Sequence, residues 1–499
     1  MLEGSCTWVF SDPAFVSWLD LDDYRTLWIN GDPGKGKTMM VIDLISKLPE
    51  RWSSNQESTL LSYFFCQNTI PELRSAVAVL RGLIYLLVVQ HESLLHHVRK
   101  RYDDAGSRLF DGSNALYTLW GILSDISNDP SLARIYLMVD ALDECEFELS
   151  GLLKLITARD SGLSSRIKWL VTSRNHPAIE EYLRPDELHL NTSLELNSSH
   201  ISCAVDAFVD FKVCGLAKRK AYDSNLTNEV RDHLYKNAKG TFLWVSLVCK
   251  ELEKVWRGHT RRILHEFPTG LEPFYERMLQ QVKGQENLEV STFCERVLRA
   301  VVLSYRPLHL EEVVVIADLP GYLSNDLPSL KDLVGRCGSF LTLRDETIYF
   351  VHQSVKDYFI SGKGSTIFSS GQSEEHRRIM NRSLKVMSET LKRDICDLKM
   401  PGTLVNGLES GRVNLHLPRR VHYACCYWID HLREVYCLQR TQISQRDANQ
   451  TYEFLQRHFL HWLEALSLMG KISEGVLMII ALQSLLEVSD IVPSCLDLA

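Results

Sequence analysis

The sequence predicts an α/β domain, with a parallel sheet and helices on both of its faces, followed by domains built mainly of helices. The first observation is that short apolar runs alternate with longer helical patterns up to about residue 192. Such alternation is typical of parallel strands joined by crossover helices. The second is that glycine-rich or acidic residues follow several of these runs, as expected where strand ends meet at the ligand edge of a sheet. The third is that strand patterns become rare beyond residue 192.

The first apolar run, residues 26–29, leads into a glycine-rich loop that opens a helix. The loop and the first helical residues are Gly31, Asp32, Pro33, Gly34, Lys35, Gly36, Lys37 and Thr38. They match the pattern G-x-x-x-x-G-K-[ST], in which glycines let backbone N–H groups surround a phosphate. Lys37 is expected to bridge the outer phosphates, and Thr38 to hold Mg²⁺. Because a strand precedes the loop and a helix follows it, we interpret it as the Walker A loop of a P-loop NTPase domain rather than a chance cluster of turn residues.

Further strands and helices are expected after this loop. The predicted strands are short apolar runs at residues 60–65, 135–140, 167–173 and 187–190. Residues 76–90 form a long apolar pattern that predicts a helix buried against the sheet, and residues 91–129 are mixed and largely helical. This order of elements favours a parallel sheet covered by helices.

The strand predicted at 135–140 delivers an acidic cluster to the sheet edge. Asp140 ends the apolar run and is expected to bind Mg²⁺, as in a Walker B strand. Asp143 and Glu144 follow, and one of them would orient or deprotonate the attacking water. A solvated acidic turn is the alternative for this stretch alone, but the phosphate loop favours the functional interpretation. Arg174 ends the next strand and is favoured as a sensor of the outer phosphate over an ordinary surface arginine.

Beyond residue 192 the patterns are mainly helical. Residues 201–256 predict several helices, and residues 293–304 and 310–319 predict two short ones. Residues 340–343 and 348–351 predict two strands joined by a tight turn. Helices followed by one hairpin indicate a winged-helix domain. It has no basic recognition helix, so we interpret it as a packing module rather than a DNA-binding one.

The C-terminal part is predicted to be all-helical. Six apolar residues spaced three and four apart define one helix face: Tyr452, Leu455, Phe459, Trp462, Leu466 and Met469. A face turned to the core is favoured over a coiled-coil partner site. Four possible metal ligands also lie close in sequence: His422, Cys425, Cys426 and His431. Their spacing is not that of a zinc module, so an ordinary helix face is the favoured interpretation.

These patterns divide the chain into five expected segments. They are a lead-in segment at 1–23, a nucleotide-binding domain at 24–192, a helical domain at 193–286, a winged-helix domain at 287–362 and a C-terminal helical domain at 363–499.

The composition argues against several classes of protein. The net charge of −8, without a long basic block, argues against nucleic acid as a partner. The 13 cysteines are odd in number and scattered, which favours reduced thiols in a cytoplasmic protein over a disulfide framework. No apolar run approaches the ~20 residues of a transmembrane helix. We therefore expect no membrane span.

Several segments together resemble the NACHT family, a branch of the STAND class of nucleotide-controlled signalling ATPases. The resemblance extends to fungal NACHT proteins tied to vegetative incompatibility and innate-immunity-like responses. The segments that carry it are residues 31–38, 62–67, 79–84, 140–145, 172–174, 240–244, 351–358 and 461–466. The acidic motif is the most specific, because the small residue Ala141 follows Asp140 and the acidic pair comes later.

The resemblance implies ATP or ADP as the cofactor, together with Mg²⁺ held by Asp140. It implies that Asp143 and Glu144 serve hydrolysis and that Arg174 is the first sensor. His352 is similar to a winged-helix histidine that contacts the β-phosphate of ADP in related switches. One position departs from the family: a threonine, Thr241, stands where related switches often have a proline that touches adenine.

The function implied by the resemblance is a signalling switch, closed with ADP and open with ATP, which self-associates on activation and hydrolyses ATP slowly as a reset. A turnover ATPase, either a motor or a kinase, is one alternative, and a nucleotide-binding scaffold without hydrolysis is another. The family also implies an effector domain before the switch and a repeat array after it. Neither is recognised in this chain, so they are expected to be missing or separate. A fragment, a truncated product and a stand-alone core all stay open.

Overall fold

A computed structural model describes residues 7–52, 58–106, 110, 114–158, 162–184, 189–194, 197–285, 287–399, 413, 415–439 and 444–487. The chain forms two compact units, residues 1–274 and 275–499. The finer division into five segments stays a prediction. Among the described helices, none combines the length and the apolar character needed to cross a bilayer.

The first unit is built on a parallel sheet of five strands in the order β2-β3-β4-β1-β5. The strands are β1 (Thr26–Asn30), β2 (Thr59–Phe65), β3 (Arg134–Asp140), β4 (Ile167–Ser173) and β5 (His189–Ser193). Every residue of β1 and β4 is buried, as expected for central strands covered on both faces. The predicted fifth strand at 187–190 is displaced: it begins at His189, and residues 187–188 lie outside the described part of the chain.

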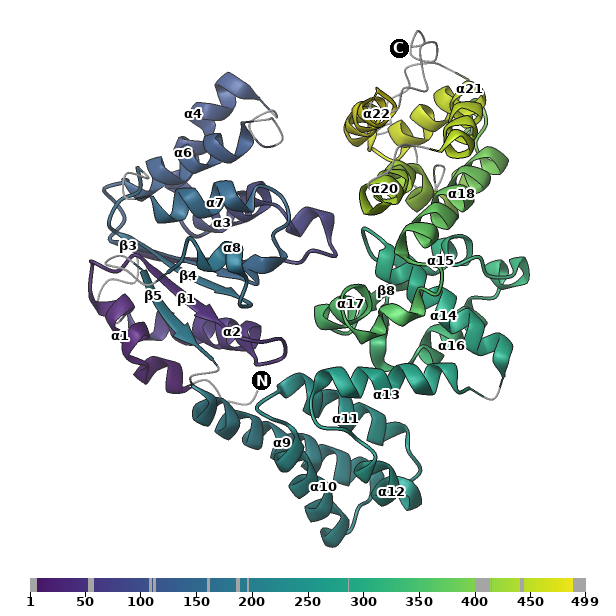
Figure 1. Ribbon diagram of the computed structural model, residues 1–499. Coiled ribbons are helices and arrows are strands. Elements are labelled where there is room, and N and C mark those ends of the chain that lie inside the picture. Colours follow the sequence, from purple (N-terminus) through teal and green to yellow (C-terminus); the bar gives the residue numbers. More distant parts are fainter. Residues whose placement is uncertain are drawn as a thin grey trace. The chain divides into compact units, whose positions relative to one another are not determined.

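Helices cover both faces of this sheet (Figure 1). They are α1 (Pro13–Asp20), α2 (Lys37–Lys47), α3 (Ala76–Gln90), α4 (Leu95–Ala105), α6 (Ala115–Ser127), α7 (Leu149–Thr157) and α8 (Pro177–Glu180). The predicted helix 76–90 is confirmed at both ends. Ser75 starts it by accepting a hydrogen bond from the N–H of Ala78, and the apolar side that contains Val79, Leu83 and Leu87 is fully buried.

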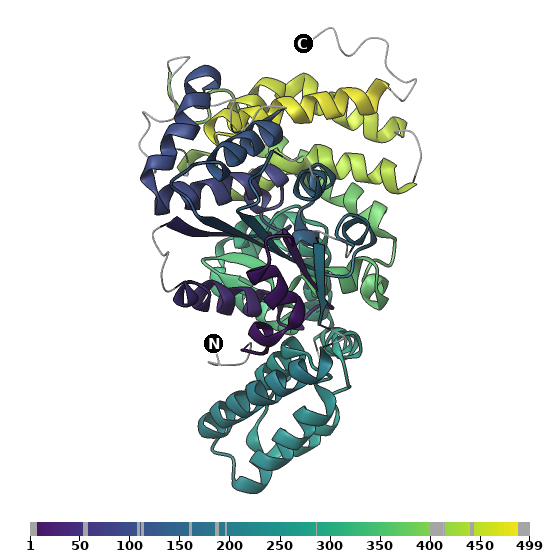
Figure 2. The same cartoon turned by 90° about the vertical axis from the view of Figure 1, so that its left-hand side faces the viewer.

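A group of helices completes the first unit (Figure 2). It comprises α9 (Ser198–Lys220), α10 (Ser224–Asn237), α11 (Phe242–Lys254) and α12 (Thr260–His265). Trp244 and Val248 of α11 are fully buried, so this apolar run packs within the protein. The helix α13 (Leu271–Lys283) leads into the second unit.

The second unit begins with helices and a small antiparallel sheet. The helices are α14 (Leu288–Leu303), α15 (Leu310–Ile316), α16 (Leu327–Arg336) and α17 (Gln353–Ile360). The sheet has the order β6-β8-β7, from strands β6 (Leu308–His309), β7 (Leu341–Arg344) and β8 (Thr347–Phe350). The predicted hairpin is therefore present. The strand β6 was not predicted, because two residues are too few to show an alternating pattern. The helix predicted at 293–304 is present as α14, which begins five residues earlier, at Leu288.

The last helices of the second unit stack on one another. They are α18 (Gln372–Thr390), α20 (His422–Gln439), α21 (Gln445–Leu468) and α22 (Ile472–Glu487). The apolar face predicted on α21 is only partly correct. Trp462 and Leu466 are fully buried, whereas Tyr452 is 38% exposed and Phe454 is buried instead. Residues spaced alternately three and four apart drift around a helix of 3.6 residues per turn, so the six predicted residues do not stay on one face over about five turns.

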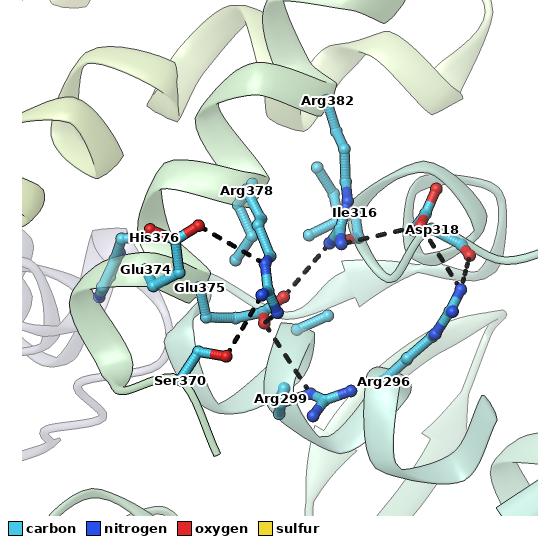
Figure 3. Close-up of polar contacts among 12 residues, drawn as sticks. Arg296, Arg299, Ile316, Asp318, Ser370, Glu374, Glu375, His376, Arg378 and Arg382 are labelled. Atoms are coloured by element: carbon cyan, nitrogen blue, oxygen red, sulfur yellow. Dashed lines mark hydrogen bonds and ion pairs between the residues drawn. The ribbon is translucent and has the colours of Figure 1, made fainter. Parts of the chain in front are cut away.

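A network of ion pairs joins α14, α15 and α18 (Figure 3). Glu375 of α18 is 6% exposed. Its carboxylate accepts hydrogen bonds from Arg378 and Arg382, both at 3.3 Å, and lies 3.9 Å from Arg299 of α14. Arg382 also donates to the carbonyl of Ile316 at the end of α15, at 2.7 Å.

Candidate functional site

The phosphate loop, residues 31–36, connects the central strand β1 to the helix α2. Gly34 and Gly36 have φ values of 79° and 92°, in the left-handed region that favours glycine. Gly36 is the N-cap of α2 and supplies no side chain to its first N–H groups. A helix start whose cap residue provides no side-chain acceptor is typical of anion-binding sites.

The lysine and threonine of the motif occupy the start of α2. The Lys37 ammonium donates to the carbonyls of Gly31 and Asp32, the latter at 3.1 Å, so it lies over the loop. Thr38 is exposed to solvent. Its hydroxyl donates to Asp140 at 2.7 Å across the sheet edge. The first helical turn and the end of β3 thus meet, although β4 separates β1 from β3 in the sheet.

Asp140 is 2% exposed at the end of β3. One carboxylate oxygen accepts from Thr38 and the other from Thr172, at 2.5 Å. Burial raises the pKa of Asp140, while the two hydroxyls and the positive charge of Lys37 oppose that shift. The carboxylate therefore lacks full compensation from the protein's own cations. A divalent cation would supply the missing charge, and a hydroxyl with a carboxylate is a donor set that suits Mg²⁺.

Asp143 and Arg174 form a pair at the same edge. The carboxylate of Asp143 accepts from the backbone N–H of Arg174 at 3.0 Å and lies 3.2 Å from the guanidinium nitrogen Nε. Both residues thus reach the sheet edge that the sequence indicated. Arg174 faces a carboxylate here, and its role as a phosphate sensor stays a prediction.

Glu144 ends the short helical turn Leu142–Glu144 and is mostly buried. Its carboxylate accepts the backbone N–H of Asn68 at 3.2 Å. Burial raises the pKa of Glu144 to about 7, with the neighbouring charge of Asp143 adding to the shift. A carboxyl with such a pKa is suited to accept a proton from water near neutral pH.

Some residues around the site were missed by the sequence interpretation. Thr172 of β4 links Asp140 to the backbone, since its hydroxyl also accepts from the N–H of Ala141 at 3.0 Å. The thiols of Cys66 and Cys145 are buried beside the acidic cluster, and burial raises the pKa of both, that of Cys145 to about 12. Every cysteine in the described part of the chain is a free thiol.

The start of α11 covers the phosphate loop. The N–H of Phe242 donates to the carbonyl of Gly34 at 3.0 Å, and the Lys35 ammonium donates to the carbonyl of Lys239 at 2.8 Å. A Cβ at Gly36 would lie 2.9 Å from the Phe242 ring, so only glycine fits there without a shift. Thr241, the departure from the family pattern, is also buried against this loop, where its methyl group would lie 2.9 Å from a Cβ at Gly34.

His352 lies in the second unit. It caps α17, where Nδ1 accepts the backbone N–H of Ser354 at 3.1 Å. This contact accounts for its position at the helix start. Its predicted contact with a nucleotide phosphate stays a prediction.

The possible metal ligands of α20 do not gather. His422 donates to the carbonyl of Leu417 at 3.2 Å, and His431 contacts Tyr423 at 2.8 Å and His376 at 2.7 Å. Within the described residues, only a different trio brings its ligand atoms together closely enough to hold a metal ion.

Comparison with known proteins gives a related family and a related protein. Residues 4–174 match the family described as Nephrocystin 3, N-terminal. The chain is 42% identical over 507 residues to the vegetative incompatibility protein HET-E-1 of Podospora anserina, in an alignment that covers 97% of this chain and 36% of that protein. The chain thus spans about a third of the length of this curated relative.

Two solved structures are similar to the chain at low sequence identity. The Walker-type ATPase PABY2304 of Pyrococcus abyssi is 14% identical, with a TM-score of 0.32, covering 68% of this chain and 92% of that one. The ADP form of Aeropyrum pernix ORC2 is 11% identical, with a TM-score of 0.32, covering 71% and 92%. Scores this low carry no argument about function.

Proposed function

We propose that the chain is a nucleotide-controlled signalling switch of the NACHT type, a proposal supported by its 42% identity to HET-E-1 over 97% of its length. The observation that carries the proposal is the contact between Thr38 of the phosphate loop and Asp140 at the end of β3, at 2.7 Å. It joins a phosphate-binding loop to a buried carboxylate in the arrangement that a magnesium nucleotide requires.

The ligand is ATP or ADP with Mg²⁺. The amides of the phosphate loop and the Lys37 ammonium hold the phosphates. Thr38 and Asp140 hold the metal ion, which supplies the positive charge that the buried carboxylate lacks. Glu144 accepts a proton from the attacking water, and Arg174 exchanges its contact with Asp143 for the outer phosphate when ATP binds.

The switch follows from differential affinity. A ligand shifts a conformational equilibrium only by the difference in its affinity for the two states. The start of α11 touches the phosphate loop through Phe242 and Lys35, so α9–α12 are the first elements that a change in the loop would move. ADP holds the closed state with the help of His352, and ATP permits self-association in an incompatibility response.

The test is the mass of the full chain in solution, measured by light scattering with Mg²⁺ and either ADP or a non-hydrolysable ATP analogue. We expect a larger assembly with the analogue. An identical mass in both nucleotides would contradict the switch.

The rate of ATP hydrolysis distinguishes a switch from the alternative functions. Slow hydrolysis is expected of a switch, and Glu144→Gln should slow it by about 100-fold or more while nucleotide still binds. Fast turnover stimulated by an acceptor would favour an ATPase motor or a kinase. Binding without any hydrolysis in the unaltered chain would favour a scaffold.

A further inference from the structure

Two histidines and an aspartate converge in the first unit, outside the candidate nucleotide site. His96 and His97 lie in the first turn of α4, and Asp129 follows the end of α6, which lies beside α4 (Figure 1). Each residue offers one ligand atom, and these three atoms lie within 4.8 Å of one another. In the part of the chain that the structure describes, no other group of three histidine, cysteine or acidic side chains meets this criterion.

His96 is held in the tautomer that a metal ion needs. Its Nδ1 lies 2.6 Å from the carbonyl oxygen of Ser93. Because a carbonyl only accepts, Nδ1 carries the proton and the lone pair is on Nε2. A histidine that donates one ring N–H to a backbone carbonyl and offers the other nitrogen is the usual arrangement of a metal ligand.

Asp129 is also oriented by its surroundings. One carboxylate oxygen accepts from the N–H and the hydroxyl of Ser131, at 2.9 and 2.6 Å. The other oxygen faces Nε2 of His97 at 2.9 Å and is the one available to a cation.

We propose that His96, His97 and Asp129 bind a divalent transition-metal ion of the zinc class. Two imidazoles with one carboxylate form a donor set that suits zinc, whereas Mg²⁺ and Ca²⁺ prefer oxygen ligands alone. Ligand atoms about 2.0 Å from a tetrahedral ion are roughly 3.3 Å apart, so His97 and Asp129 need to separate by only about 0.4 Å. Three protein ligands leave a fourth position for water.

The two imidazole rings support this assignment. Their centroids are 3.7 Å apart, so the two rings lie next to each other. A simple ion pair between His97 and Asp129 would explain the position of the His97 ring, but it would give no role to His96. The bound ion would tie the start of α4 to the turn after α6.

The test measures zinc bound to the full chain by equilibrium dialysis at a buffered free-zinc concentration. We expect the unaltered chain to bind one equivalent more than His96→Ala and one more than His97→Ala. The control is His461→Ala, because His458 and His461 form a second imidazole pair on α21, with their Nδ1 atoms 3.4 Å apart. Cysteines are unchanged in every variant, so their contribution cancels in the differences.

Equal zinc content in the unaltered chain and in both histidine variants would overturn the proposal, and so would an equal loss in the His461→Ala control. Ser131→Ala sharpens the test because it keeps all three ligands and removes only the Ser131 hydroxyl, which donates to Asp129. We expect its zinc affinity to fall by about 10-fold or more. An unchanged affinity would contradict a ligand role for Asp129. Millimolar Mg²⁺ should not displace the ion, and displacement would refute the zinc-class assignment.

Discussion

Two glutamates, one in each unit, show opposite ways of placing a carboxyl group inside a protein. Glu375 is 6% exposed and is surrounded by the guanidinium groups of Arg299, Arg378 and Arg382 (Figure 3). Glu144 is also mostly buried, yet the hydrogen bond that reaches its carboxylate comes from the backbone N–H of Asn68. Burial raises its pKa to about 7.

The difference separates a structural role from a reactive one. Removing a charged group from water is costly, and Glu375 recovers that cost from the arginines around it. Glu144 does not recover the cost of burying its charge, because the nearby Arg174 pairs with Asp143. A carboxyl that the fold leaves uncompensated gains or loses a proton near neutral pH, which is the property a general base needs.

The largest expected effect comes from breaking the compensated pair. Glu375→Gln leaves the arginines around it without their counter-charge, and should lower the free energy of opening of this region by about 3–5 kcal/mol. Amide hydrogen exchange in α14 and α18 measures that energy directly.

The matched control for this change is Glu374→Gln. Glu374 pairs with Arg377 on the same helix, but its side chain is 36% exposed. Loss of the Glu374 charge should lower the free energy of opening by less than about 1 kcal/mol. Similar effects from both substitutions would mean that the surroundings of Glu375 do not compensate its charge.

Glu144→Gln should raise the free energy of unfolding, whereas Glu375→Gln lowers the stability of its region. The raised pKa means that the neutral carboxyl stabilises the fold below pH ~4, and this stability is lost as the pH rises through about 7. Glutamine stays neutral, so the variant should be more stable than the unaltered chain by at most about 3 kcal/mol at pH 8, and little changed at pH 4. Urea midpoints of the first unit at these two pH values give the result. A loss of stability at pH 8 would show that the charge of Glu144 is compensated after all.

Thr172→Val tests the hydroxyl that supports Asp140. It removes a buried hydrogen bond to the carboxylate and a partly buried one from the N–H of Ala141, and should cost about 2 kcal/mol. The control is Thr390→Val, since the buried Thr390 hydroxyl has no hydrogen-bond partner among the described residues. That change should be neutral or slightly stabilising in the same urea experiment. Equal costs would mean that the Thr172 contacts contribute nothing specific.

The sequence predicted features that depend on local patterns. The phosphate loop, the strand ending at Asp140 and the helix 76–90 follow from residue types at short spacing, and the structure contains each of them as a loop, strand or helix. The position of β4 between β1 and β3 could not be predicted from the sequence, because the order of strands depends on the packing of the whole sheet. For the same reason Thr172 was not recognised as the residue that positions Asp140.

Partners distant in sequence were missed in other places. Nothing local indicates that Phe242 packs on Gly36, or that His96 and His97 meet Asp129. The adjacent histidines were a usable signal, but the carboxylate that completes the trio is 32 residues away from His97. Conversely, His422 and Cys425 share a helix face and form no cluster, since sequence spacing does not show what lies opposite a helix.

The most direct test of the central claim is the nucleotide that the purified full chain binds in the presence of Mg²⁺, compared with Lys37→Ala and with Lys47→Ala. Lys47 lies on the same helix, paired with Asp43 at 2.8 Å, and serves as the control. We expect the unaltered chain and the Lys47 variant to bind one nucleotide each, and the Lys37 variant to lose at least about 100-fold in affinity. Equal binding by all three proteins would contradict a phosphate site at this loop.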